Sequence, residues 1–236
     1  AFDLLFEIYK EQGYPERDIP NLILTHNLHG LDIDQRATQL AAFALLMKAR
    51  EKNRRILRNP PELRLTWTTP TEGWQLPNVP ELNNEDWQPL LDAFKYADNL
   101  GSLITPPEAD YQEIQTQLEA FEQSGRPETS IYVLQLRHLL HQTQLLHGKY
   151  RAVIANPPYM GSKAFNPHLR TYIDARFSRS RKDLFAVFME TALELTSRGG
   201  IVGMINQHAW MFLSSYEKLR EHLLDNYDLQ TMIHLG

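Results

Sequence analysis

The sequence lacks cysteine altogether, and this absence removes three kinds of chemistry. Disulfide bonds, thiolate metal sites and cysteine nucleophiles are excluded for these 236 residues. No apolar run approaches the roughly 18–20 residues that a membrane-spanning helix needs, and we expect the longest run, residues 41–47, to form a buried helix face. No signal-peptide pattern is present at the amino end. We therefore expect a cytoplasmic protein with no membrane partner.

An overall excess of positive charge is lacking as well. The formal net charge of −5 argues against a protein that coats nucleic acid along its whole surface. Positive charge is nevertheless concentrated between residues 160 and 182, where only Asp174 is acidic and the cations are Lys163, Arg170, Arg176, Arg179, Arg181 and Lys182. Such a cluster is either a solvated helix face or a surface for nucleic-acid phosphates.

Hydrophobic periodicity predicts alternating helices and strands in the two ends of the chain, with a less regular middle. For the first two thirds it predicts a helix over 1–12, a strand over 27–33, a helix over 35–57 capped by Asp34, an irregular segment over 59–89, and helices over 108–121 and 131–147. For the last third it predicts a strand over 151–155, a helix over 183–197 ended by Gly199-Gly200, a strand over 201–205, a helix over 215–224 and a strand over 229–235.

Strands that alternate with helices are typical of an α/β fold with a mostly parallel sheet. We expect three segments: 1–57 as the first part of the core, 58–149 as a loop-rich and helical insertion, and 150–236 as the second part. Ligands of such sheets bind beyond the carboxyl ends of the strands. The sequence Asn156-Pro157-Pro158-Tyr159 follows the predicted strand at that edge.

The Asn-Pro-Pro-Tyr sequence suits chemistry on a ring-attached amino group. Such a nitrogen is a poor nucleophile because its lone pair is delocalised into the ring, and two acceptors aimed at its N–H bonds favour the tetrahedral geometry that attack requires. The Asn156 side-chain oxygen and a proline carbonyl can be those acceptors, and consecutive prolines hold the backbone in place. Tyr159 offers a flat surface on which an extruded base can stack. The alternative is that the sequence forms only a rigid turn.

Residues 154–159 resemble the catalytic motif of S-adenosylmethionine-dependent methyltransferases that modify amino groups, in particular the N6-adenine group. The resemblance extends to the segments 160–163, 182–185, 199–210 and 232–236 and to the short element Gly101-Ser102-Leu103-Ile104. These segments are similar to the PglX-like methyltransferases of BREX phage-exclusion systems and, more distantly, to type IIG restriction–modification enzymes. The resemblance implies a Rossmann-like methyltransferase core, adenine-specific methylation of double-stranded DNA, and further subunits of a defence system as partners.

The resemblance also implies cofactor contacts. The segment His29 to Asp34 is similar to a motif in which a carboxylate at a strand end accepts hydrogen bonds from the ribose of S-adenosylmethionine. By that match Asp32 is the ribose ligand and Ile33 packs on the cofactor adenine, while Asn156 serves both cofactor and target base. The alternative for Asp32 is a carboxylate that only terminates the strand. Asp98 is a weaker candidate for the amino group of the cofactor adenine.

One family feature is missing from the sequence: the glycine-rich loop that holds the methionine end of the cofactor. By the same resemblance, the last strand pair and a target-recognition domain are missing as well. We therefore expect a core that is incomplete at both ends and that, isolated, is inactive and binds S-adenosylmethionine weakly or not at all. Three alternatives stay open: methylation of RNA or protein glutamine by the same motif, a non-catalytic DNA-binding or partner-docking module, and a nuclease, which lacks a convincing acidic cluster. His138 and His141 share one helical face, but no third ligand is evident and we expect no metal.

Overall fold

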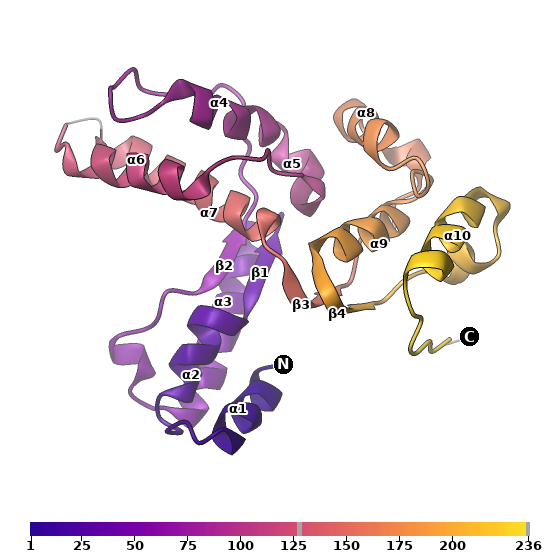
Figure 1. The fold of residues 1–236 in the computed structure, drawn as a ribbon, viewed down its shortest axis with the longest axis horizontal. Helices are drawn as coiled ribbons and strands as arrows, with labels where there is room; N and C mark the ends of the chain where they lie inside the picture. The colour runs from indigo at the N-terminus through magenta and orange to yellow at the C-terminus, as the bar shows by residue number, and fades with distance from the viewer. Residues whose placement is uncertain (127–128, 235–236) are drawn as a thin grey trace. The chain divides into compact units, whose positions relative to one another are not determined.

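The computed structural model describes residues 1–126 and 129–234 and divides the chain into two compact units, Ala1–Leu146 and His147–Gly236 (Figure 1). It shows a mixed α/β protein with two small parallel sheets, each of two strands, in the part of the chain that is described. The single larger parallel sheet of a Rossmann-like core therefore stays a prediction, as does the division into three segments. None of the helices described has the length and apolarity needed to cross a bilayer.

The first sheet pairs β1 (His29–Asp32) with β2 (Arg64–Trp67) in parallel, with Asp32 opposite Trp67. Helix α3 (Gln35–Lys52) follows β1 and packs on both strands. It begins where expected, because the Asp34 carboxylate accepts the backbone N–H of Arg36 at 2.8 Å and so caps the helix. The irregular segment predicted over 59–89 is wrong in part, since β2 lies inside it. The four residues of β2 are too few to show the alternation of apolar and polar side chains that predicts a strand.

The predicted buried face over residues 41–47 is wrong in part. Phe43 is 62% exposed and Met47 37%, and Leu40 on the same side of α3 is 69% exposed. The buried residues of α3 are Thr38 and Ala49. Leu45 and Leu46 are partly buried against the apolar cluster at the amino end of the chain, but a sheet of two strands covers only a narrow strip of a helix and leaves Leu40, Phe43 and Met47 exposed. The helix also ends at Lys52, earlier than predicted.

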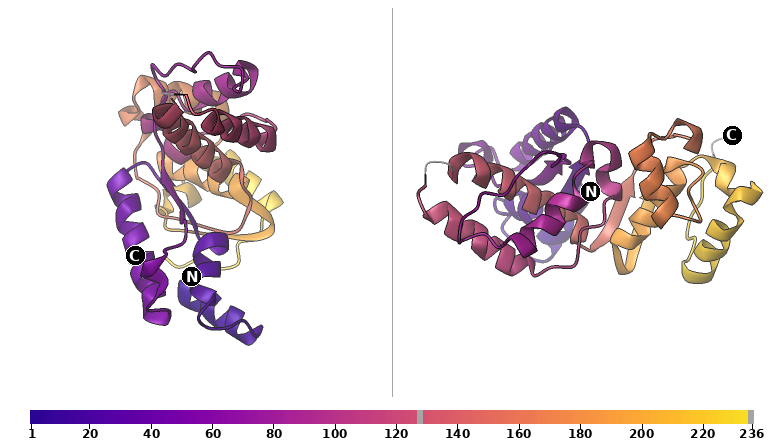
Figure 2. Two further views of the ribbon diagram at one scale, coloured as in Figure 1. Left: turned by 90° about the vertical axis from the view of Figure 1, so that its left-hand side faces the viewer. Right: turned by 90° about the horizontal axis from the view of Figure 1, so that it is seen from above.

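A helical core occupies the second half of this unit. Its members are α4 (Asn84–Ala93), α5 (Ala97–Leu100), α6 (Tyr111–Gln123) and α7 (Thr129–His147). Gln117 of α6 joins α6 to α4, because its side-chain oxygen accepts both the Trp87 indole N–H at 3.1 Å and the Asn83 backbone N–H at 3.0 Å. Figures 1 and 2 show α4, α6 and α7 side by side, and an Arg137–Glu122 ion pair of 2.6 Å links α7 to α6.

A smaller apolar cluster lies at the amino end of the chain. Helix α1 (Phe2–Glu11) matches the predicted helix and buries Phe2 and Phe6. The short helix α2 (Ile19–Leu22) continues into a single π-helical turn, Ile23–Asn27, which leads into β1. The buried members of the cluster are Phe2, Phe6, Ile19, Ile23, Leu24, Ala49 and Ile56.

The second unit contains the sheet of β3 (Tyr150–Ala155) and β4 (Thr196–Met204), again parallel, and helix α9 (Leu184–Leu195) packs on both strands (Figure 1). Gly199-Gly200 does not end α9 as predicted. The helix stops at Leu195, and the glycines lie in β4, where the pairing register shifts between Tyr150 and Ala152. A Cβ at Gly200 would lie only 2.6 Å from the Thr196 side chain, and Gly199 has φ +72°. The glycines are needed for this bulge rather than for a helix end.

Two helices complete this unit. Helix α8 (Pro167–Arg176), which the sequence interpretation did not include, carries part of the basic cluster. Helix α10 (Glu217–Asn226) was predicted, and it contributes Leu219 and Leu223 to a core with Phe185 and Trp210. The strand predicted over 229–235 is wrong for residues 229–234, which form no strand; Leu235 lies outside the described residues.

Candidate active site

The Asn-Pro-Pro-Tyr turn begins directly after β3, at the carboxyl end of the second sheet. The backbone N–H of Ile205 donates to the Ala155 carbonyl at 3.3 Å, so the strand pairing reaches up to the turn. Asn156, Pro158 and Tyr159 are exposed, whereas Pro157 is buried. The turn is therefore anchored by one proline and presents its polar and aromatic members to solvent at the ligand-binding edge of the sheet.

Tyr159 is held against the end of β4 and the start of α9. Its hydroxyl donates to the Ile205 carbonyl at 3.3 Å, and its ring meets the Phe185 ring edge-on, with centroids 6.3 Å apart and an interplanar angle of 80°. Phe185 in turn contacts the buried Tyr216 ring at 5.9 Å. The Tyr159 side chain is still 49% exposed. One aromatic group is thus oriented by its neighbours while about half of it stays available for stacking.

Asp183 connects the segment after Tyr159 to the start of α9. Its Oδ1 accepts the backbone N–H of Met160 at 3.1 Å and that of Phe185 at 3.3 Å, so one carboxylate oxygen caps the helix and holds the turn. Backbone pairing strengthens this connection: Leu184 N–H donates to the Met160 carbonyl at 2.9 Å, and Gly161 and Asp183 form an antiparallel bridge. We call residues 160–163 paired with 182–184 the clamp. The clamp fixes the backbone immediately after the catalytic candidates.

The Asp183 carboxylate also acts on Tyr216. Burial raises the pKa of Tyr216 to about 12, and the negative charge of Asp183 contributes to the increase. The Tyr216 phenol is therefore uncharged throughout the neutral range. The Tyr216 ring packs against the Phe185 ring, and its hydroxyl is not a candidate general base.

The candidate cofactor residues lie in the first unit, at the carboxyl end of β1. Asp32 is exposed, and its Oδ1 accepts the backbone N–H of Asp34 at 2.8 Å, which fixes the carboxylate at the strand end. Ile33 is 51% exposed. The structure also places Gly101 beside it, since a Cβ at Gly101 would lie 3.5 Å from Ile33 Cδ1, and Gly101 has φ +54°. The structure therefore brings the two segments, 29–34 and 101–104, together.

These residues fit the adenosine half of S-adenosylmethionine. An exposed carboxylate suits the ribose hydroxyls, which are hydrogen-bond donors, and a half-exposed isoleucine against a glycine offers an apolar surface for a purine. Asp98 of α5 is exposed and accepts from the Asn99 side-chain amide at 2.6 Å, so its assignment to the adenine amino group stays a prediction.

The histidine pair has structural contacts. His138 Nε2 lies 2.9 Å from the Thr69 hydroxyl, and its ring packs on Trp67 with centroids 4.6 Å apart. Burial lowers the pKa of both His138 and His141. Among the described residues, no group of three or more His, Cys, Asp or Glu side chains could hold a metal ion.

Sequence reasoning did not identify Asp183, Phe185 and Ile205 as parts of this site. Asp183 could have been recognised as a helix cap, because an aspartate precedes an apolar helical segment. Its bond to Met160 N–H, and the contacts of Tyr159 with Phe185 and Ile205, join residues 23 to 46 positions apart. No local pattern carries information on such contacts.

Comparisons with known proteins agree with the motif. Residues 26–236 match the model of a protein family described as "Eco57I restriction-modification methylase". The chain is 38% identical to "Adenine-specific methyltransferase BrxX" of Escherichia coli O9:H4 (strain HS) and 35% identical to "Adenine-specific methyltransferase PglX" of Lacticaseibacillus casei (strain Zhang), in both cases over all of this chain. It is 27% identical to "Type II methyltransferase M.BanIII" of Aneurinibacillus aneurinilyticus over 36% of the chain. The chain spans 22%, 20% and 15% of these three relatives, respectively.

Proposed function

The chain belongs to the Eco57I restriction-modification methylase family, and on that premise we propose that the complete protein methylates N6 of an adenine extruded from double-stranded DNA, with S-adenosylmethionine as the methyl donor. The observation that carries the proposal is the exposed Asn-Pro-Pro-Tyr turn at the carboxyl end of β3, with Tyr159 oriented beside it. Two relatives that match the entire chain are named adenine-specific methyltransferases, which favours adenine as the target.

The turn would act on the target amino group by hydrogen bonding. In this proposal the Asn156 side-chain oxygen and the Pro157 carbonyl accept the two N–H bonds of the adenine amino group. Both acceptors favour the tetrahedral nitrogen and the positive charge that develops on it during attack. Because Pro157 is buried and both prolines restrict φ, the backbone carbonyl needs little ordering when the base arrives.

Tyr159 would hold the extruded base. Stacking of a base on an aromatic side chain contributes about 1–3 kcal/mol, which offsets much of the cost of unstacking the base from the duplex. The Phe185 edge and the Ile205 carbonyl restrict the Tyr159 side chain before the base binds, so less side-chain entropy is lost on binding. Asp183 is in this view a positioning residue, which acts on the base only through the turn.

Asp32 and Ile33 would hold the adenosine half of the cofactor, whose contribution is an electrophilic methyl group. Asp32 would accept the ribose hydroxyls, and Ile33 would pack on the adenine ring with Gly101 behind it. We include Asn156 among the cofactor contacts by its resemblance to the family motif. The family is described as one of restriction-modification methylases, and together with the resemblance to phage-exclusion enzymes this makes host-DNA marking or phage defence, with other subunits as partners, part of the proposal.

The proposal is tested with the complete protein and radiolabelled S-adenosylmethionine. We expect label in duplex DNA, at adenine N6 after nucleoside digestion. RNA and a glutamine-containing protein substrate are assayed in parallel, because the same motif can act on those amino groups. Transfer to RNA or glutamine without transfer to DNA would replace this proposal by that alternative. Salt-dependent DNA binding without any transfer would favour a non-catalytic binding module.

A further inference from the structure

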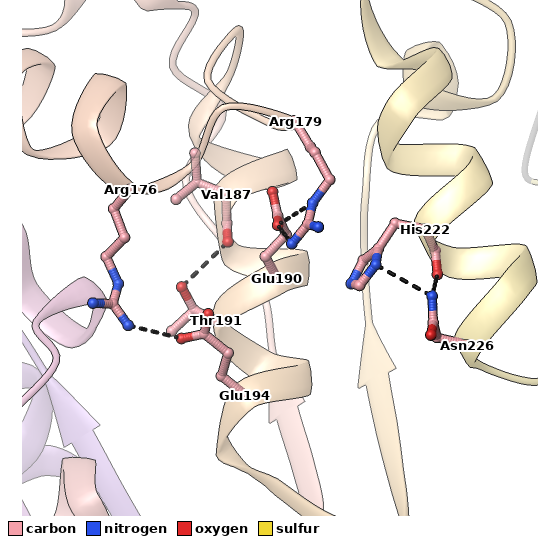
Figure 3. Close-up of polar contacts among 8 residues, drawn as sticks. All are labelled: Arg176, Arg179, Val187, Glu190, Thr191, Glu194, His222 and Asn226. Carbon is pink, nitrogen blue, oxygen red and sulfur yellow. Dashed lines mark hydrogen bonds and ion pairs between the residues drawn. The ribbon is translucent and has the colours of Figure 1, made fainter.

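The cations that follow Tyr159 in the sequence are not equivalent in the structure. Arg179 is committed to Glu190, a residue only 5% exposed, with its guanidinium 2.7 Å from the carboxylate. Arg176 pairs with Glu194 at 3.4 Å. Figure 3 shows both arginines directed at acidic side chains of α9. The Arg179 side chain is itself 42% exposed, but its loss would leave the buried Glu190 carboxylate without this partner, which is costly, so Arg179 has a structural role.

The other two arginines of the cluster also have partners within the protein. Arg181 lies 3.8 Å from the Asp174 carboxylate, and Arg170 donates to the carbonyl of Ser162. The Arg170 contact crosses from α8 to the clamp and so helps to hold the clamp in place. All four arginines therefore already make an ion pair or a hydrogen bond within the protein.

The two lysines differ from the arginines. Lys163 and Lys182 are exposed, and within residues 1–126 and 129–234 neither side chain has an ion pair or a hydrogen bond. Both belong to the clamp. The backbone N–H of Ser162 donates to the Lys182 carbonyl at 2.9 Å, and Gly161 pairs with Asp183, so the two lysines are attached to neighbouring, paired stretches of backbone.

We propose that Lys163 and Lys182 together contact the DNA backbone phosphates that flank the extruded adenine. This inference rests on the proposed function and adds its phosphate-binding residues. The clamp follows Tyr159 directly in sequence, and the Asp183–Met160 bond closes it at the residue next to Tyr159, so the backbone that carries both lysines is held close to the base-stacking residue. An ammonium group without a protein partner is a mobile point charge suited to phosphate, and contacts of this kind fix the register of a protein on a duplex.

Other exposed cations of this unit provide a matched control. Arg198 is exposed and lies near the start of β4, whereas the Asn-Pro-Pro-Tyr turn follows the carboxyl end of the paired strand β3. Arg198→Gln removes the same charge as Lys163→Gln, away from the proposed contact. Arg176→Gln removes a cation of the cluster that is already paired with Glu194. Neither variant should alter the phosphate contacts.

The test measures how strongly DNA binding of the complete protein depends on salt. Affinity for a fluorescent duplex is determined by anisotropy between about 50 and 200 mM KCl, and the slope of log K against log salt is compared. Each lost phosphate contact lowers the slope by about 0.9, so Lys163→Gln/Lys182→Gln should lower it by about 1.8. Arg198→Gln and Arg176→Gln should leave the slope unchanged, and Lys163→Arg/Lys182→Arg should retain it. Thermal melting checks that the variants fold.

An unchanged slope in the folded double glutamine variant would overturn the inference, and so would an equal decrease in Arg198→Gln. These outcomes are separate from failure of the proposed function. If the wild-type protein methylates adenine but the salt slope is the same with and without the two lysines, only the phosphate site is rejected. If the wild-type protein methylates no DNA but its salt slope depends on both lysines, the proposed reaction is rejected and the phosphate contact is supported.

Discussion

The two candidate sites are held in place by different means. In the second unit, the Asn-Pro-Pro-Tyr turn is fixed by contacts with distant segments: Asp183 bonds Met160, and Ile205 and Phe185 restrain Tyr159. In the first unit, the Asp32 carboxylate is fixed by a bond to the N–H of Asp34, two residues away, while the distant contacts are those of the Asp32 backbone carbonyl, which accepts the Thr68 N–H at 2.9 Å, and of Gly101 with Ile33. The candidate base site thus depends on tertiary packing, whereas the carboxylate proposed for the cofactor depends mainly on a local turn.

This difference predicts where each site can be damaged. A substitution remote from the sequence motif should disturb the base site through the clamp, but the carboxylate of Asp32 should respond chiefly to changes at residues 32–34. The following variants, all in the complete protein, test the comparison from the largest expected effect to the smallest.

Asn156→Ala should cause the largest loss. It removes one of the two acceptors proposed for the amino group, and removal of one preorganised hydrogen-bonding group in a transition state lowers kcat by about 100- to 1,000-fold. The variant should keep the wild-type melting temperature, because Asn156 is exposed. Radiolabelled methyl transfer to duplex DNA measures the effect. Retention of near-normal transfer would remove Asn156 from the mechanism.

Asp32→Ala should weaken cofactor affinity by about 10- to 100-fold, since hydrogen bonds to a charged group contribute about 1.5–3 kcal/mol. The effect should appear in Kd measured by calorimetric titration and in KM for S-adenosylmethionine more than in kcat. Asp34→Asn is the control, because it keeps an acceptor for the Arg36 N–H and should leave affinity unchanged. If Asp34→Asn weakened binding as much as Asp32→Ala, the assignment of the ribose ligand would be wrong.

Asp183→Ala should reduce kcat by roughly 10-fold and destabilise the protein by about 1 kcal/mol through loss of the α9 cap. Asp183→Asn keeps an acceptor for Met160 and Phe185 and should restore most of both properties. Asp183→Ser can cap the helix with its shorter side chain, so stability recovered without kcat would separate capping from positioning. Equal kcat in the wild type and Asp183→Ala would show that the clamp does not position the turn.

The smallest effect concerns the pH dependence of stability in the first unit. Burial lowers the pKa of His138 and His141 from 6.5, so the unfolded chain binds protons that the folded chain does not. Stability from these residues is fully present above pH 6.5 and decreases as the pH falls below that value. Urea unfolding at about pH 7.5, 6.5 and 5.5 should show the decrease, and His138→Gln should reduce it. A decrease of the same size in His138→Gln would assign it to other groups.

Much of the local structure could be predicted from the sequence. The Asp34 cap, the apolar period of α1 and α9, and the strand before Asn156 are local features, and each appears where the residues predict it. The chemistry of the Asn-Pro-Pro-Tyr turn also follows from its residue types. Family membership, which the comparisons show, was predicted from this turn together with the other segments that resemble the family.

Other features depended on the tertiary structure. Gly199-Gly200 is suited equally to a helix end and to a bulge, and only the register of β4 against β3 decided between them. The apolar side chains of α3 predict burial, yet the width of the neighbouring sheet determines how many are covered. Six cations after Tyr159 look alike in the sequence, but three ion pairs and one hydrogen bond, to partners 7 to 18 residues away, occupy the four arginines and leave Lys163 and Lys182 exposed. The sequence by itself determined which groups are present and where helices such as α3 begin, because those are local properties. The tertiary structure decided which groups are already bonded, because their partners come from residues far along the chain.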